Sequence, residues 1–251
     1  MTFLTSCSAL DAWNITPTPI IPTETPLPTA TINWFPPSAT PTPRTFSTPL
    51  PTPELRPGLG DVLIKDDFSD PSLWDIAASN QASSTMDENR LTIAVQSGVY
   101  MLSLRNDLVL ANYYAEITAR PSLCRGEDNY GMLVRASGSA SYYRIVLACN
   151  GTVRVERLIN GARLVLQQPL PSADAPPGAP GEVRIGVWAV GREMRIFLNG
   201  RYQFSINDPN LPSGSIGVFV RSVGNTAAIV SFSDLSIRSV DYILPTITPS
   251  P

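Results

Sequence analysis

The chain contains no histidine among its 251 residues, and this limits the chemistry that its other side chains can perform. Ser/His/Asp and Cys/His nucleophiles, a histidine general base and histidine-ligated zinc or iron sites are all excluded. Paired carboxylates remain for acid–base chemistry, as in glycosidases. The glutamates are scattered, however, and a place as a solvated strand or turn residue is a simpler interpretation of each than a catalytic role. They include Glu116, Glu127, Glu156, Glu182 and Glu193.

Recognition of a ligand by a sheet face is a second kind of chemistry, because sugar rings stack on aromatic faces while Arg and Tyr reach hydroxyl groups. The stretch 130–145 predicts a hairpin that turns at Gly138 and Ser139. Strand alternation then places Arg135, Tyr142 and Arg144 on the outer face, and it places four other side chains in the core. This core set is Met132, Val134, Tyr143 and Ile145.

A fourth candidate for ligand binding, Trp188, lies in the later strand-like run 183–190. Val183, Ile185 and Val187 take the inward positions of this run, so Trp188 is expected on the outer face, where it could stack on a ligand. Both assignments have a structural alternative. The arginines can pair with neighbours such as Glu156, and a loop can cover the tryptophan.

The acidic cluster Asp66, Asp67 and Asp70 raises a calcium hypothesis, because carboxylates are the ligands that calcium prefers. Its spacing matches no 12-residue calcium loop, and Asp70-Pro71-Ser72 is typical of a turn with an Asx cap. We therefore predict no cofactor or metal, and calcium remains the alternative.

The elements that must position these side chains are β-strands. Apolar and polar residues alternate through 61–240 without a sustained helical period, which predicts about a dozen strands. Three Asn-Gly pairs separate such runs, and Asn-Gly is the preferred dipeptide of two-residue hairpin turns: Asn150-Gly151, Asn160-Gly161 and Asn199-Gly200. We expect an all-β, antiparallel jelly-roll β-sandwich, with a closed barrel as the alternative architecture.

Composition divides the chain into parts. The first 60 positions hold 13 prolines and 13 threonines, and proline at this density cannot pack a core, so 16–60 is predicted to be a disordered Pro/Thr-rich stalk. The remaining parts are an N-terminal segment 1–15, the β-sandwich 61–240 and a tail 241–251 of the same composition as the stalk.

The N-terminal residues Leu4, Thr5, Ser6 and Cys7 resemble the lipobox of a bacterial lipoprotein signal peptide, in which the cysteine is acylated. The basic and apolar regions that precede a lipobox are not present in the six residues before Cys7. Either the start codon is placed too late or the match is chance. With a lipid on Cys7, no other means of membrane attachment is expected.

Cysteine counting supports export, because lipidation of Cys7 leaves the pair Cys124 and Cys149. We expect these two to form a disulfide that pins the loop 125–129 to the neighbouring strand. Two buried free thiols in a reducing compartment are the alternative.

Four stretches of the domain resemble concanavalin-A-like jelly rolls, in particular the laminin-G-like and 3-keto-disaccharide-hydrolase-type modules of exported bacterial proteins. They are Asp66-Asp67-Phe68-Ser69-Asp70 with Trp74, 130–135 with 142–145, Phe197-Leu198-Asn199-Gly200, and 217–219 with 230–237. The resemblance implies the fold but not an activity. Related laminarinase-type glycosidases carry a Glu-x-Asp-x-x-Glu string on one strand, and this sequence has none.

These observations predict a non-catalytic, surface-anchored module that binds carbohydrate or another cell-envelope polymer. A structural or interaction domain without a small ligand is the first alternative, and a glycan-processing hydrolase is the second. The net charge of −3 argues against a nucleic-acid partner, which would require a basic stripe. The expected location is extracytoplasmic, with lipid attachment to the membrane or cell surface.

Overall fold

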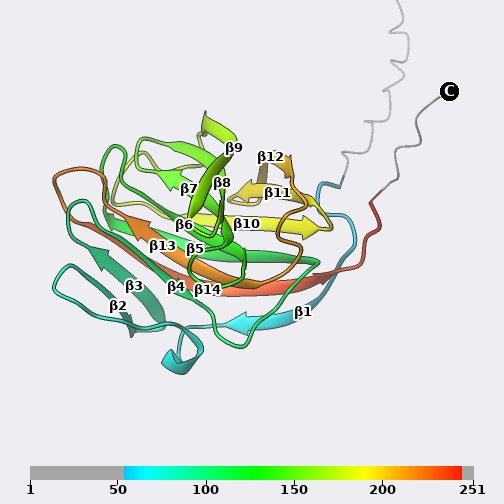
Figure 1. Ribbon diagram of the computed structural model, residues 1–251, viewed down its shortest axis with the longest axis horizontal. Helices are drawn as coiled ribbons and strands as arrows, with labels where there is room; N and C mark the ends of the chain where they lie inside the picture. The colour runs from blue at the N-terminus through cyan, green and yellow to red at the C-terminus, as the bar shows by residue number, and fades with distance from the viewer. Residues whose placement is uncertain (1–53, 245–251) are drawn as a thin grey trace, which may run out of the picture. The chain divides into compact units, whose positions relative to one another are not determined.

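The computed structural model describes residues 54–244, which form the ribbon in Figure 1. The lipobox-like segment with Cys7, most of the predicted stalk and the end of the tail lie outside the described residues. Within 54–244, no helix has both the length and the apolar character needed to cross a membrane.

Fourteen strands and one short 3-10 turn, η1 (Pro71–Leu73), make up the described part of the chain. The strands are β1 (Leu59–Asp66), β2 (Ala82–Asp87), β3 (Arg90–Val95), β4 (Tyr100–Leu104), β5 (Tyr113–Leu123), β6 (Asn129–Ala136), β7 (Tyr142–Ala148), β8 (Thr152–Ile159), β9 (Ala162–Pro171), β10 (Val183–Val190), β11 (Glu193–Leu198), β12 (Arg201–Asn207), β13 (Ser215–Arg221) and β14 (Ala228–Val240).

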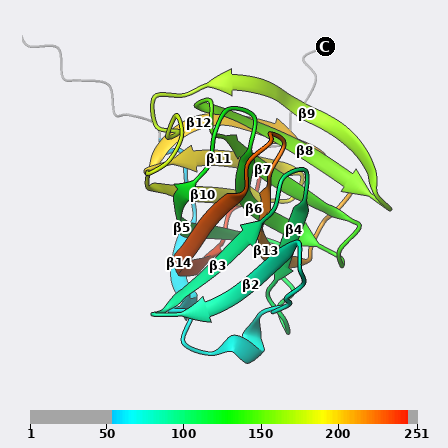
Figure 2. The same cartoon turned by 90° about the vertical axis from the view of Figure 1, so that its left-hand side faces the viewer.

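The strands form two antiparallel sheets that pack face to face, which confirms the predicted all-β sandwich. The eight-stranded sheet has the order β12-β11-β10-β5-β14-β3-β2, and β1 pairs with the second half of β14. The six-stranded sheet has the order β4-β13-β6-β7-β8-β9. In Figure 2, β8 and β9 lie at the opposite side of the domain from β2 and β3.

Alternating apolar side chains from both sheets form the main core. Met132, Ile145 and Val218 of the six-stranded sheet and Ile117 and Ile185 of the eight-stranded sheet are all fully buried in it. The inward positions predicted for the central hairpin, including Val134 and Tyr143, are thereby confirmed.

Two of the three Asn-Gly pairs form the expected kind of turn. Asn160 and Asn199 have φ of 50° and 52°, and each is followed by a glycine that also has positive φ, as a type I′ turn requires. At the third pair only Gly151 has positive φ. There the Asn150 side chain instead accepts hydrogen bonds from the amide and the hydroxyl group of Thr152.

The two outer faces of the sandwich differ in what covers them. On the eight-stranded sheet, an apolar cluster around Trp188 is covered by the segments that enter and leave the domain, through Leu55, Tyr242 and Leu244. On the six-stranded sheet, the apolar cluster around Phe219 draws every member from the strands of that sheet itself. Within residues 54–244, segments outside the sheet therefore pack on the outer apolar cluster of the eight-stranded sheet but not on that of the six-stranded sheet.

Candidate functional site

Long polar and aromatic side chains cover the outer face of the six-stranded sheet. We call this surface the arginine face and define it by Tyr100, Tyr142, Arg144, Arg154, Glu156, Arg163, Phe219 and Arg221. Strand pairing places Arg144 opposite Glu156 and Tyr142 opposite Leu158, with Leu158 opposite Arg163 on β9. Alternation along each strand directs these side chains away from the core.

The Glu156 carboxylate lies at the centre of three arginines. Its Oε1 atom lies 2.8 Å from Arg154 Nε and 3.0 Å from Arg163 Nη2, and its Oε2 atom is bound by the guanidinium group of Arg144. Glu156 is fully buried, whereas the Arg163 side chain is 49% exposed. Three arginines therefore share a single carboxylate, which leaves two positive charges in excess.

The arginines determine the ionisation of Glu156. Burial alone would raise the pKa of this carboxyl group, but hydrogen bonds and positive charge from Arg154 and Arg144 outweigh burial and hold the pKa below its ordinary value. Glu156 therefore stays ionised, and it accepts hydrogen bonds without being able to donate a proton.

Aromatic side chains complete the arginine face around Arg144. The hydroxyl groups of Tyr100 and Tyr142 lie 2.9 Å apart, and the Tyr100 ring packs on Phe219 at 5.7 Å between centroids. The Arg144 guanidinium lies over both rings, 5.8 Å from Tyr100 and 5.7 Å from Phe219. Burial raises the pKa of the Tyr100 hydroxyl group, so Tyr100 is neutral.

The prediction that Tyr142 and Arg144 are exposed on the outer face is half correct. Both point away from the core as expected, but they are only 2% and 5% exposed. The Tyr100–Tyr142 contact and the ion pair with Glu156 bury them within the layer of side chains that covers the sheet. Arg144 is a structural partner of Glu156, which is the alternative left open by the sequence.

The prediction for Arg135 is wrong. Arg135 has a φ of 51°, and the pairing of β6 with β13 shifts register at this point, so the strand bulges and alternation fails. The side chain is completely buried. Its guanidinium donates to the carbonyl groups of Ala111 and Leu211, and thus holds two loops at one end of the sandwich.

The expected exposure of Trp188 is also wrong. Its ring has the predicted outward parity but is fully buried. Trp188 Nε1 donates to the Pro57 carbonyl at 3.0 Å, Tyr242 packs edge-on against the ring, and the Arg195 guanidinium lies 4.5 Å from its centroid. Residues assigned by composition to the stalk and the tail cover the face on which this tryptophan lies.

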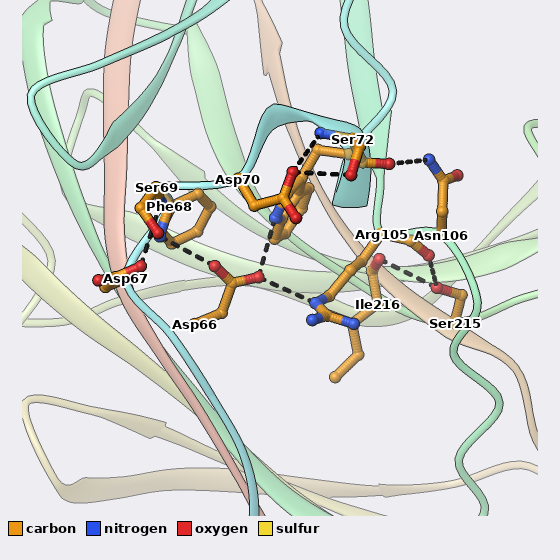
Figure 3. A network of polar contacts seen from close by, with 11 residues as sticks. Asp66, Asp67, Phe68, Ser69, Asp70, Ser72, Arg105, Asn106, Ser215 and Ile216 are labelled. Atoms are coloured by element: carbon orange, nitrogen blue, oxygen red, sulfur yellow. Dashed lines mark hydrogen bonds and ion pairs between the residues drawn. The ribbon is translucent and has the colours of Figure 1, made fainter.

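The acidic cluster at the end of β1 is a network of internal hydrogen bonds, shown in Figure 3. Asp66 accepts from the Phe68 amide, from Trp74 Nε1 and from Arg105 Nε, at 2.9, 3.0 and 2.9 Å. Asp70 caps η1 by accepting from the Ser72 amide at 2.9 Å. Within residues 54–244, no group of three or more His, Cys, Asp and Glu side chains could hold a metal ion.

The expected bond between Cys124 and Cys149 is confirmed, with Cα atoms 5.8 Å apart. It joins the residue after β5 to the residue after β7. Asp128, in the loop beside it, accepts from the amides of Val223 and Gly224 at 2.8 and 3.1 Å. At the disulfide itself the Cys149 amide donates to the Asp128 carbonyl at 2.9 Å, so the loop 125–129 is held to the end of the neighbouring strand, as predicted.

Arg154 and Arg163 were missed as site residues by the sequence reasoning. Arg154 could have been predicted from the hairpin at Asn150-Gly151, because its register places Glu156 opposite Arg144. Arg154 precedes Glu156 by two residues and therefore lies on the same face of the sheet. The next hairpin, at Asn160-Gly161, adds Arg163 to the same face.

Comparison with known proteins identifies the fold. No family model and no curated protein matches the sequence. Among solved structures, the chain is similar to the carbohydrate-binding module CBM66 from Bacillus subtilis, with a TM-score of 0.54, 15% identity, and coverage of 66% of this chain and 96% of that one. A Bacillus subtilis protein of unknown function with a galectin-like fold gives a TM-score of 0.53 at 13% identity, with 72% and 97% covered.

The catalytic domain of an endo-1,3-beta-glucanase (laminarinase) from Thermotoga petrophila RKU-1 is similar as well. Its TM-score is 0.51 at 10% identity, and the match covers 72% of this chain and 98% of that domain. A binding module and a catalytic domain thus share this architecture, and identities this low carry the fold alone. The described domain is an antiparallel β-sandwich whose fold is similar to that of galectin-like and jelly-roll modules.

Proposed function

We propose that this chain is a non-catalytic module that binds a carbohydrate polymer on its arginine face. The observation that carries the proposal is the contrast between the two outer faces. Terminal segments cover the aromatic cluster of the eight-stranded sheet, whereas no described segment outside the six-stranded sheet joins the apolar cluster of the arginine face. On that face Arg154, Arg163 and the ring of Tyr100 are at least partly exposed. Aromatic rings and convergent polar groups are what a sugar-binding surface requires.

The lack of catalysis in this proposal rests on the carboxylates. Hydrolysis of a glycosidic bond ordinarily requires two carboxyl groups, of which one must donate a proton. Glu156 is the only acidic residue in the strands of the six-stranded sheet, and arginines engage both of its oxygen atoms. The arginine face therefore offers neither a proton donor nor a second carboxylate.

The proposal also places the module at the cell surface through a lipid on Cys7. A disulfide between Cys124 and Cys149 fits an oxidising, extracytoplasmic environment. A Pro/Thr-rich segment between Cys7 and the domain would act as a spacer that rises about 3.1 Å per residue where it is extended. Membrane fractionation tests the anchor: Cys7→Ser should move the native protein from the membrane fraction to the soluble fraction, and unchanged fractionation would exclude lipid attachment at Cys7.

Affinity electrophoresis of the full chain through gels that contain different polysaccharides tests the binding function. We expect at least one polymer to retard the protein, and we expect Tyr100→Ala to reduce the retardation. Tyr202→Ala is the matched control, because this tyrosine is 40% exposed on β12 of the other sheet. Melting temperatures establish that both variants fold.

Two results would count against this function. Equal loss of retardation in the two tyrosine variants would remove the arginine face as the binding surface. Release of reducing ends from a retained polymer would show catalysis, and the module would then be a hydrolase.

A further inference from the structure

Charge is distributed differently on the two outer faces of the sandwich. On the eight-stranded sheet each of three arginines has its own carboxylate: Arg120 lies 2.8 Å from Glu182, Arg184 lies 3.3 Å from Glu116, and Arg195 lies 2.7 Å from Glu193. On the arginine face, three arginines share Glu156. Each of these three arginines of the first face is thus neutralised by a carboxylate of its own, whereas the cluster around Glu156 has an excess of positive charge.

Arg221 increases this excess. It follows Phe219 by two residues on β13, so it has the same outward parity, and its pairing partners are Tyr100 on β4 and Asn129 on β6. Within residues 54–244 Arg221 makes no ion pair. Four arginines and one glutamate therefore leave three positive charges on the arginine face, although the whole chain has a net charge of −3.

Several guanidinium donors on this face remain available to a ligand. Arg154 donates to Glu156 through its Nε atom, and Arg163 lies 3.0 Å from Glu156 through Nη2 while its side chain is 49% exposed. Guanidinium groups present donors in a planar fork that matches the oxygen atoms of carboxylate, sulfate and phosphate groups. The Glu156 carboxylate itself demonstrates this chemistry, because it is an anion already bound by the same side chains.

The spacing of the arginines indicates an extended ligand. They come from four strands in the order β13, β7, β8 and β9, and β6 lies between the first two. Neighbouring strands are about 4.8 Å apart, so the arginines extend over about 19 Å across the sheet. A single sugar could not contact such a row, whereas a polymer that crosses the strands could.

We propose that the ligand of the arginine face is an acidic polysaccharide, whose carboxylate or sulfate groups pair with the arginines while a sugar ring lies against Tyr100, the partly exposed aromatic residue of this face. This inference rests on the proposed function and adds the chemical class of the ligand. Ion pairs between these surface arginines and the acidic groups of the ligand would be partly exposed to solvent, so salt should weaken the binding.

Affinity electrophoresis of the full chain distinguishes the ligand classes, with polygalacturonate, dextran sulfate and neutral dextran as probes. We expect retardation by at least one acidic polymer and none by dextran, with the retardation lost at about 1 M salt, where the Debye length is about 3 Å. The acidic polymer that is retained more strongly identifies carboxylate or sulfate as the preferred group.

Two arginines of similar exposure provide a matched pair of variants. The Arg163 side chain is 49% exposed on the arginine face, and the Arg184 side chain is 53% exposed on the opposite sheet. Arg163→Gln should weaken binding of the acidic polymer about 10-fold, as loss of a charge-assisted hydrogen bond does, whereas Arg184→Gln should change it less than about 2-fold. Arg163→Lys should retain part of the affinity because it keeps the charge.

The outcomes separate this inference from the function on which it rests. If neutral dextran retards the protein and Arg163→Gln does not change this retardation, the proposal of an acidic ligand is wrong, but carbohydrate binding stands. Equal weakening by Arg163→Gln and Arg184→Gln would show a response to net charge alone and would also overturn the proposal of an acidic ligand. Failure of every polysaccharide to retard the protein would overturn the proposed function itself.

Discussion

Arg144 and Glu156 are directly opposite each other on β7 and β8, and each is buried on the outer side of the six-stranded sheet. The pair is stabilised from both sides, because Arg154 and Arg163 also bind the carboxylate and the rings of Tyr100 and Phe219 flank the guanidinium. An ion pair in this setting fixes the positions of the surrounding side chains. It thereby shapes the surface that we assign to ligand binding.

Removing the charge of Glu156 should destabilise the domain strongly. Glu156→Gln leaves Arg144 buried without an anion, which should lower the free energy of unfolding by about 3 to 5 kcal/mol. Glu116→Gln is the matched change on the other sheet, where the partner Arg184 is half exposed, and it should cost about 1 kcal/mol or less. Urea denaturation measures both, and equal effects would show that the arginine cluster has no special structural role.

The same carboxylate predicts a dependence of stability on pH. The folded-state pKa of Glu156 is lower than its ordinary value of 4.5, so its contribution to stability is complete above that value and is lost as the pH falls through the folded-state pKa. The difference in unfolding free energy between the wild type and Glu156→Gln should therefore be constant above about pH 5.5 and shrink in acid. Urea titrations at a series of pH values measure this difference, and a difference that grows in acid would contradict the assigned pKa direction.

Loss of the disulfide should destabilise the domain without changing its fold. The bond closes a loop with a sequence separation of 25 residues, and opening a loop of this length costs about 3 kcal/mol. Cys124→Ser combined with Cys149→Ser should therefore lower the free energy of unfolding by about that amount. Alkylation of the exported wild-type protein without reductant should leave both residues unlabelled in the intact mass, and labelling of both would contradict the bond.

Residues next to the predicted stalk should contribute to the stability of the domain. A chain that starts at Gly58 lacks Leu55 and the Pro57 carbonyl that contact Arg195 and Trp188, whereas a chain that starts at residue 51 keeps them. The shorter chain should be less stable by about 1 to 3 kcal/mol. Its tryptophan emission should shift to longer wavelength as Trp188 becomes exposed to water.

Both truncated chains contain the same two tryptophans, Trp74 and Trp188, so their spectra can be compared directly. Identical emission and identical unfolding midpoints would show that the contacts of residues 55–57 contribute nothing to the fold.

The strands and their inward faces could be predicted from the sequence because alternation is a local property of a chain. Tyr143 and Ile145 lie in the core as their parity requires. Strand β2 was not predicted, since its sequence Ala-Ser-Ser-Thr-Met-Asp lacks an apolar alternation; it forms as an edge strand through pairing with β3. Such pairing depends on a partner strand rather than on the segment alone.

Exposure at the candidate site could not be predicted, because it depends on contacts between distant parts of the chain. The alternation of side chains along β10 predicted the correct face for Trp188. However, Pro57 and Tyr242, which come from the N-terminal and C-terminal ends of the domain's sequence, cover the ring. Arg135 departs from alternation at a bulge whose partner is β13, about 80 residues further along the chain. The sequence around Arg135 contains no local sign of that partner.

The pairing of β1 with β14 has a mechanical consequence. Leu59 lies opposite Val240, and the Asp241 amide donates to the Gly58 carbonyl at 2.9 Å, so the chain enters and leaves the domain at one point. Tension along the flanking segments would pass between these neighbouring residues and would open the two strands from that end, one hydrogen-bonded pair at a time. The force would act on β1 and β14 at the point where the chain enters and leaves the domain. The other strands of the sandwich would not bear it directly.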